Sequence, residues 1–98
     1  VIDEFKDESL DFCIVDGDLR DQCALRGIQK IRPGGILVLD NIERYLPRTN
    51  PSTAPTARNM DAGFASRNWE IFSKIVKNWR YIWTSDGVSD TAIWFKPH

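Results

Sequence analysis

Two apolar runs in this sequence each end at a carboxylate, and these endings hold the residues best suited to chemistry. The first run, DFCIVDG, ends at Asp16 and Gly17, and the second, RPGGILVLDN, ends at Asp40 and Asn41. One helix-length segment separates the two runs. The pattern therefore predicts a strand-helix-strand unit that brings both endings to one edge of a parallel sheet, where open α/β folds bind their ligands.

Asp16, Asp40 and Asn41 offer two carboxylates and an amide oxygen, the ligand types that a hard cation such as Mg²⁺ prefers. Neighbouring strands lie about 4.8 Å apart, so the three side chains can converge on one ion. A metal there would bind a substrate hydroxyl and lower its pKa. Alternatively, Asp16 accepts a hydrogen bond or serves as the base for a transferred proton, and Asp40-Asn41 simply turns the chain. Asp16 and Asp40 are the candidate catalytic residues.

The residues directly after the second run are placed to contact a small-molecule substrate. They are Asn41, Glu43, Arg44 and Tyr45. Four arginines bracket the segment that follows and can bind a phosphate or carboxylate: Arg44, Arg48, Arg58 and Arg67. The alternative is a solvated loop with ordinary charges. His98 is the only histidine, which argues against a His-based catalytic triad.

The apolar pattern also predicts the elements that must position these residues. Leu10–Asp16 is predicted to be a strand buried on both faces, and Ile36–Leu39 is predicted to be a second apolar strand. Asp18 is the expected N-cap of an intervening helix that runs to about Ile31, and Pro33-Gly34-Gly35 turns the chain after it. The expected buried stripe of this helix is Ala24, Ile28 and Ile31.

A polar loop is predicted over residues 42–66, where prolines recur and no apolar period persists. Loops of this length in compact domains are usually functional lids or disordered segments. A helix is then expected from Ser66. Its apolar face would consist of Trp69, Phe72, Ile75, Val76 and Trp79. Tyr81–Thr84 and Thr91–Phe95 are predicted to be strands, and the short link between them requires an antiparallel pair.

The composition is that of a small globular domain. The chain has 98 residues, 42% hydrophobic and 28% charged, with a net charge of −1, so neither nucleic acid nor a membrane is an expected partner. Cys13 and Cys23 are spaced neither as a disulfide framework nor as a metal site, and we expect buried reduced thiols. Together with the lack of a signal peptide and of any run of about eighteen apolar residues, this favours a cytoplasmic protein.

The order strand-helix-strand-loop-helix-strand-strand resembles the C-terminal half of a class I S-adenosylmethionine-dependent methyltransferase, which has a Rossmann-like fold. CIVDG resembles the fourth strand of that family, RPGGILVLDN the fifth, and TAIWF the antiparallel seventh, inserted beside the fifth. The resemblance covers residues 10–96. The spacing Asp16-Gly17-x-x-Arg20-x-x-Cys23 is similar to that of an uncharacterised subfamily. The implied fold is an α/β three-layer sandwich with strand order fourth, fifth, seventh, sixth and helices on both faces.

The resemblance implies S-adenosylmethionine as the methyl donor and oxygen of a small molecule or glycan as the acceptor. Asp16 and Gly17 would line the donor pocket. Metal-dependent catechol-type O-methyltransferases place their metal ligands at the ends of the same two strands, which matches Asp16, Asp40 and Asn41. The Gly-rich donor-binding turn of the family is absent, so we expect this chain alone to be inactive, either as a piece of a longer enzyme or as a remnant.

Two alternatives belong to other functional classes. In a signalling receiver domain, Asp16 would be the phosphoacceptor and Lys96-Pro97 would match the Lys-Pro pair of that family, but no acidic pair on an earlier strand is present to bind Mg²⁺. In a non-catalytic interaction module, the strand Asp11–Asp16 would be an unpaired apolar edge, and such edges pair with another chain. We therefore expect the chain to self-associate into a homo-oligomer.

Overall fold

Residues 6–17 and 19–98 are described by a computed structural model of the chain. Over these residues the chain forms four strands and two α-helices, in the order β1 (Leu10–Val15), α1 (Arg20–Lys30), β2 (Ile31–Asp40), α2 (Arg67–Ile75), β3 (Arg80–Ser85) and β4 (Asp90–Phe95), with a short 3-10 helix, η2 (Ile42–Arg44), after β2. The fold class is therefore α/β, as the sequence predicts.

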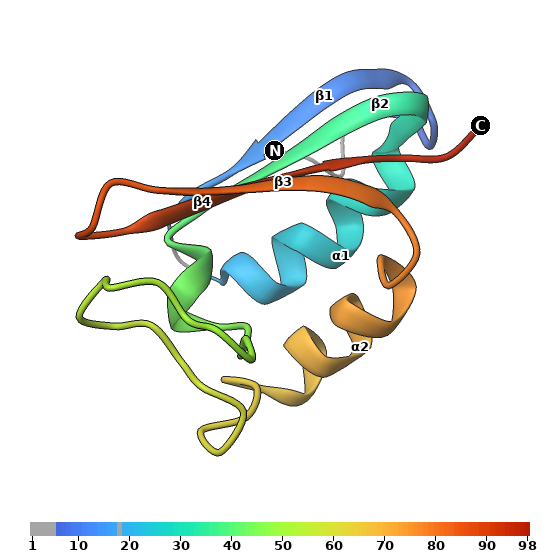
Figure 1. Ribbon diagram of the computed structural model, residues 1–98. Helices are drawn as coiled ribbons and strands as arrows, with labels where there is room; N and C mark the ends of the chain where they lie inside the picture. The colour runs from blue at the N-terminus through green and yellow to red at the C-terminus, as the bar shows by residue number, and fades with distance from the viewer. Residues whose placement is uncertain (1–5, 18) are drawn as a thin grey trace.

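The four strands form one mixed sheet in the order β1-β2-β4-β3 (Figure 1). β1 runs parallel to β2, with Val15 opposite Leu39, so the carboxyl ends of these strands lie side by side. β4 is antiparallel to both of its neighbours, β2 and β3. The predicted strand-helix-strand unit and the predicted antiparallel hairpin are both confirmed.

Both helices pack against the same face of this sheet and contact each other (Figure 1). The core between them includes Ile28 of α1, Phe72 of α2, and Leu37 and Trp94 of the sheet. The sequence predicts helices on both faces, whereas the described residues form two layers rather than three. Apolar side chains on the opposite face are consequently exposed, among them Phe12, Ile14 and Ile82.

No helix in the described part of the chain is long and apolar enough to cross a membrane.

The boundary between α1 and β2 differs from the prediction. Ile31, expected as the last helical residue, is fully buried and begins β2 in an extended conformation. Pro33-Gly34-Gly35 lies inside β2, beside a register shift in the β1-β2 pairing. A Cβ atom on Gly35 would lie 2.7 Å from the carbonyl oxygen of Asp11, so the close approach of β1 requires glycine there. Asp18, the predicted N-cap, lies outside the described residues.

α2 begins as the sequence predicts, because the Ser66 hydroxyl caps it by accepting a hydrogen bond from the Trp69 N–H at 3.3 Å. Trp69, Phe72 and Val76 are buried, as expected for the apolar face. Ile75 is 45% exposed. A helix turns about 100° per residue, which rotates Ile75 about 120° away from Trp69 and out of the contact with the sheet.

Both cysteines are free thiols, as predicted, but they are half-buried rather than fully buried. Desolvation by burial, reinforced by the nearby Cys23, raises the pKa of the Cys13 thiol. Cys13 is therefore a poor nucleophile at neutral pH.

Candidate functional site

A pocket of about 360 Å³ opens where β1 ends and α1 begins. Its lining includes Gly17, Arg20, Asp21, Tyr45, Ser66 and Trp69. Gly17 and Tyr45 are residues that the sequence singles out for donor and substrate binding, and the fold brings them together although 27 positions separate them in the chain. The pocket lies at the carboxyl end of the parallel pair, which is the expected place for a ligand in an open α/β sheet.

Asp16 is not part of the pocket lining, but it is bonded to two residues that are, Gly17 and Arg20. Its Oδ1 atom accepts hydrogen bonds from Arg20 Nη2 at 2.6 Å and from the Gly17 N–H at 2.8 Å. The first of these is an ion pair between residues four apart, a spacing that the start of α1 makes possible. The Asp16 side chain remains 64% exposed, so its second oxygen can still accept a hydrogen bond from a ligand.

Arg20 connects the ends of the two parallel strands. One of its Nη atoms binds Asp16, while the other donates to the Tyr45 hydroxyl at 3.2 Å and to the Asp40 carbonyl at 3.4 Å. The side chain is only 12% exposed, and its Nε–H is buried without a hydrogen-bond partner among the described residues. A buried donor without an acceptor costs about 1–3 kcal/mol, so the site would gain from an acceptor that reaches it.

Aromatic and polar side chains complete the wall of the pocket. The Tyr45 ring stacks on Trp69, with 4.9 Å between ring centroids and 19° between ring planes. Asp21, in the first turn of α1, accepts hydrogen bonds from the Ser66 hydroxyl at 3.1 Å and from the Asn68 amide at 3.2 Å. These contacts tie the start of α2 to the start of α1, so both helix starts face the same pocket.

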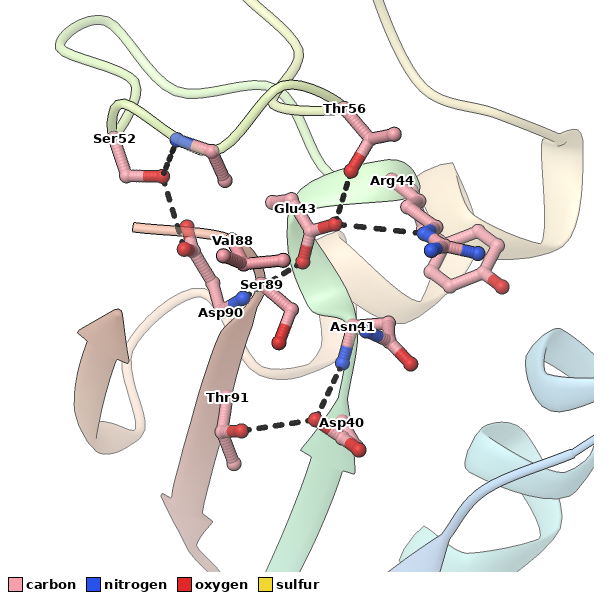
Figure 2. Close-up of polar contacts among 12 residues, drawn as sticks. Asp40, Asn41, Glu43, Arg44, Ser52, Thr56, Val88, Ser89, Asp90 and Thr91 are labelled. Atoms are coloured by element: carbon pink, nitrogen blue, oxygen red, sulfur yellow. Dashed lines mark hydrogen bonds and ion pairs between the residues drawn. The ribbon is translucent and has the colours of Figure 1, made fainter. Parts of the chain in front are cut away.

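The carboxylate of Asp40 lies in a different environment. Its Oδ1 accepts from the Asn41 N–H at 2.9 Å and from the Thr91 hydroxyl at 3.0 Å (Figure 2). Asn41 adopts a left-handed conformation, φ 56°, which asparagine tolerates better than most residues. Asp40 lines a second pocket of about 340 Å³ together with Thr84. Only the backbone of Asp40, and not its carboxylate, contacts Arg20.

Glu43 is buried instead of facing a substrate, which corrects the prediction from the sequence. It is 1% exposed, and its two oxygens accept hydrogen bonds from the Asp90 N–H, at 2.8 Å, and from the Thr56 hydroxyl (Figure 2). Arg44 Nε lies 3.5 Å from the same carboxylate. Glu43 therefore fastens the loop after β2 to the start of β4. Of the predicted substrate residues around it, Arg44 stays half exposed.

Asp90 is a second buried carboxylate, next to Glu43, and nothing in the sequence pattern pointed to it. It is 0% exposed and accepts hydrogen bonds from the Ser52 hydroxyl at 2.9 Å and from Trp83 Nε1 at 2.8 Å. Burial alone would raise the pKa of Asp90, but hydrogen bonds from Ser85, Trp83 and Ser52, with the charge of Arg48, lower it below the usual value. The carboxylate is therefore held in its charged form. Glu43 and Asp90 together anchor both ends of residues 43–56 to the sheet.

A divalent metal does not fit the strand ends as they stand. The positive charge beside Asp16 is the guanidinium of Arg20, and Oδ1 of Asp40 is already bonded to Asn41 and Thr91. In the described ranges 6–17 and 19–98, no group of three or more His, Cys, Asp or Glu side chains is placed to hold a metal ion. Asp16, Asp40 and Asn41 would have to exchange these partners before they converged on Mg²⁺.

No protein-family model matches the sequence, and no curated protein is significantly similar to it.

Arg20, Asp21 and Trp69 line the pocket at Gly17, and the sequence did not predict them as site residues. Arg20 has a detectable signal, the four-residue spacing from Asp16 across a helix start, whereas the stacking of Trp69 on Tyr45 depends on how α2 packs.

Proposed function

We propose that this chain forms part of an S-adenosylmethionine-dependent methyltransferase that methylates an oxygen of a small-molecule or glycan acceptor. The strand order is the main support. β1, β2, β4 and β3 correspond in direction and order to the fourth, fifth, seventh and sixth strands of that fold. The pocket beside Gly17 and Tyr45 lies at the end of the sheet where such enzymes act.

In this proposal the described residues bind and orient the reactants. S-adenosylmethionine, when bound, supplies an electrophilic methyl group. Asp16 offers its free carboxylate oxygen to the donor, while the ion pair with Arg20 keeps that carboxylate in place. The Tyr45 hydroxyl accepts a hydrogen bond from Arg20, which leaves its own proton available to an acceptor oxygen. The ring of Trp69 shields this side of the pocket from water.

Titration with S-adenosylhomocysteine, the product form of the donor, tests the proposal. Two-dimensional ¹H–¹⁵N spectra of the chain should show shifts of the Gly17, Arg20 and Asp21 amides, with weak, millimolar binding because the chain carries only part of a donor pocket. Asp16→Ala should remove these shifts. Asp11→Ala is the matched control, because Asp11 is an exposed, ion-paired aspartate in β1, the strand that ends directly before Asp16, and lies outside the pocket lining. If no amide near Asp16 responds, or Asp16→Ala changes nothing, the proposal fails.

A second candidate function, an interaction module, is favoured by β1. In the described part of the chain β1 pairs only with β2, and its outward side chains Phe12 and Ile14 are 57% and 62% exposed. An edge strand with apolar side chains is a template for pairing with a second chain, so we propose self-association through residues 11–16. Light scattering should detect oligomers that Ile14→Lys disperses and that Val88→Lys, at a 72% exposed turn position, leaves intact. A wild-type monomer would refute this candidate.

A further inference from the structure

Another open pocket lies near the C-terminal end of α2, beside Ser73, Val76 and Lys77, and apart from the site described above. It is a pocket of about 290 Å³ between α2, the loop after η2 and the β3-β4 hairpin, and it shares no lining residue with the pocket at Gly17. Its walls are mainly aromatic and apolar: Phe64, Val76, Tyr81, Trp83 and Trp94. Small-molecule sites are typically concave and apolar with a few placed polar groups, and this pocket has that composition.

Two cationic side chains, Arg48 and Lys77, line the same pocket. The guanidinium carbon of Arg48 lies 4.4 Å from the centroid of the Trp83 ring, so the charge is stacked on an aromatic wall. Arg48 influences the pKa of Asp90 but makes no ion pair with it. Lys77 has no ion-pair partner among residues 6–17 and 19–98 either, and the pocket lining contains no Asp or Glu. Two cations thus face an aromatic pocket that supplies no anion.

We propose that this pocket binds a flat aromatic carboxylic acid. The aromatic part would pack against Trp83 and Tyr81, since aromatic rings gain from offset stacking as well as from burial. The carboxylate would lie between Arg48 and Lys77, which supply charge-assisted hydrogen bonds. A neighbouring pocket of about 330 Å³ shares Arg48 and Tyr81 and continues past Asn50, so a polar substituent on the ligand can extend in that direction.

The tryptophan side chains allow a site-resolved test. The chain has four tryptophans, whose indole N–H signals can be assigned from single Trp→Phe variants, and 2-naphthoate serves as the probe. We expect millimolar or tighter binding that shifts the signals of Trp83 and Trp94, which line this pocket, and leaves that of Trp69, which lines the other pocket. The neutral analogue 2-naphthalenemethanol should bind roughly threefold to tenfold more weakly, the range expected for two partly exposed ion pairs, one with Arg48 and one with Lys77.

Matched lysine variants separate the charge of the pocket from general effects. Lys77→Gln should weaken 2-naphthoate binding about threefold or more, whereas Lys74→Gln, in the last turn of α2 but outside the pocket lining, should not. The proposal is overturned if 2-naphthoate leaves Trp83 and Trp94 unchanged, if the alcohol binds as tightly as the acid, or if all four indoles shift together. None of these outcomes bears on S-adenosylhomocysteine binding at Gly17, so the two proposals stand or fall separately.

Discussion

Replacing Glu43 tests whether the buried carboxylate holds the loop after β2 to the sheet. The side chain is 1% exposed and accepts hydrogen bonds from the Asp90 N–H and the Thr56 hydroxyl. Glu43→Ala leaves the buried Asp90 N–H without an acceptor, at a cost of about 1–3 kcal/mol, and opens a small cavity that adds about 1 kcal/mol. We expect the free energy of unfolding to fall by about 3 kcal/mol. Glu43→Gln keeps an acceptor oxygen and should cost only about 1 kcal/mol.

Urea unfolding followed by tryptophan fluorescence measures these differences directly. In a domain of this size, a loss of about 3 kcal/mol also lowers the melting temperature by about 15 °C. Glu70→Ala is the control, because Glu70 forms an exposed ion pair with Arg67, and such pairs contribute about 0–1 kcal/mol. The reasoning is refuted if Glu43→Ala is no more destabilising than Glu70→Ala, or if Glu43→Gln is as damaging as Glu43→Ala.

Three further predictions follow from the same structure. Because the pKa of Asp90 is lowered in the fold, this carboxylate stabilises the fold above about pH 4, the ordinary aspartate pKa, and loses that effect as the pH falls further. The urea midpoint of Asp90→Asn should therefore fall less on acidification than the wild-type midpoint. If both midpoints fall equally with pH, this prediction is wrong. Gly35→Ala should destabilise the chain by about 2 kcal/mol or more in the same assay, because the new Cβ would clash with the Asp11 carbonyl oxygen. Gly63→Ala is the control: its Cβ would contact no atom, so it should cost only about 1 kcal/mol of backbone strain. Because the pKa of the Cys13 thiol is raised, iodoacetamide should alkylate Cys13 slowly in the folded chain and faster in urea. Mass spectrometry measures both rates. Equal rates would argue against burial as the cause of the raised pKa.

The periodic segments were predictable, and the boundaries between them were not. Apolar runs ending at Asp16 and Asp40 predict the parallel pair β1-β2, and the short link before Thr91 predicts the antiparallel hairpin; both are present. The start of β2 was missed because Pro33-Gly34-Gly35 normally marks a turn. Here Gly35 lets β1 pass close to an extended chain, and that approach depends on a partner strand rather than on local sequence.

The candidate site likewise contains residues that the sequence pointed to and residues whose roles it did not. Gly17, which the family resemblance implies for the donor, and Tyr45, predicted from its place after a strand, line one pocket because parallel strands place their carboxyl ends together. The structural role of Glu43 was not predicted, because an acidic residue after a strand is normally solvated. Its burial depends on the Asp90 N–H, 47 residues away, which has Glu43 as its acceptor.

The α/β class of the fold, the two helices and the polar edge of the sheet could be predicted from the sequence, because hydrophobic period and strand direction are properties of short segments. The packed structure was needed to show that both helices share one face, that the Arg20 guanidinium pairs with Asp16, and that Arg48 and Lys77 face an aromatic pocket. These outcomes depend on which side chains meet across the packed layers. Buried charges and hydrogen-bond donors gain their partners only after the helices and strands have packed together.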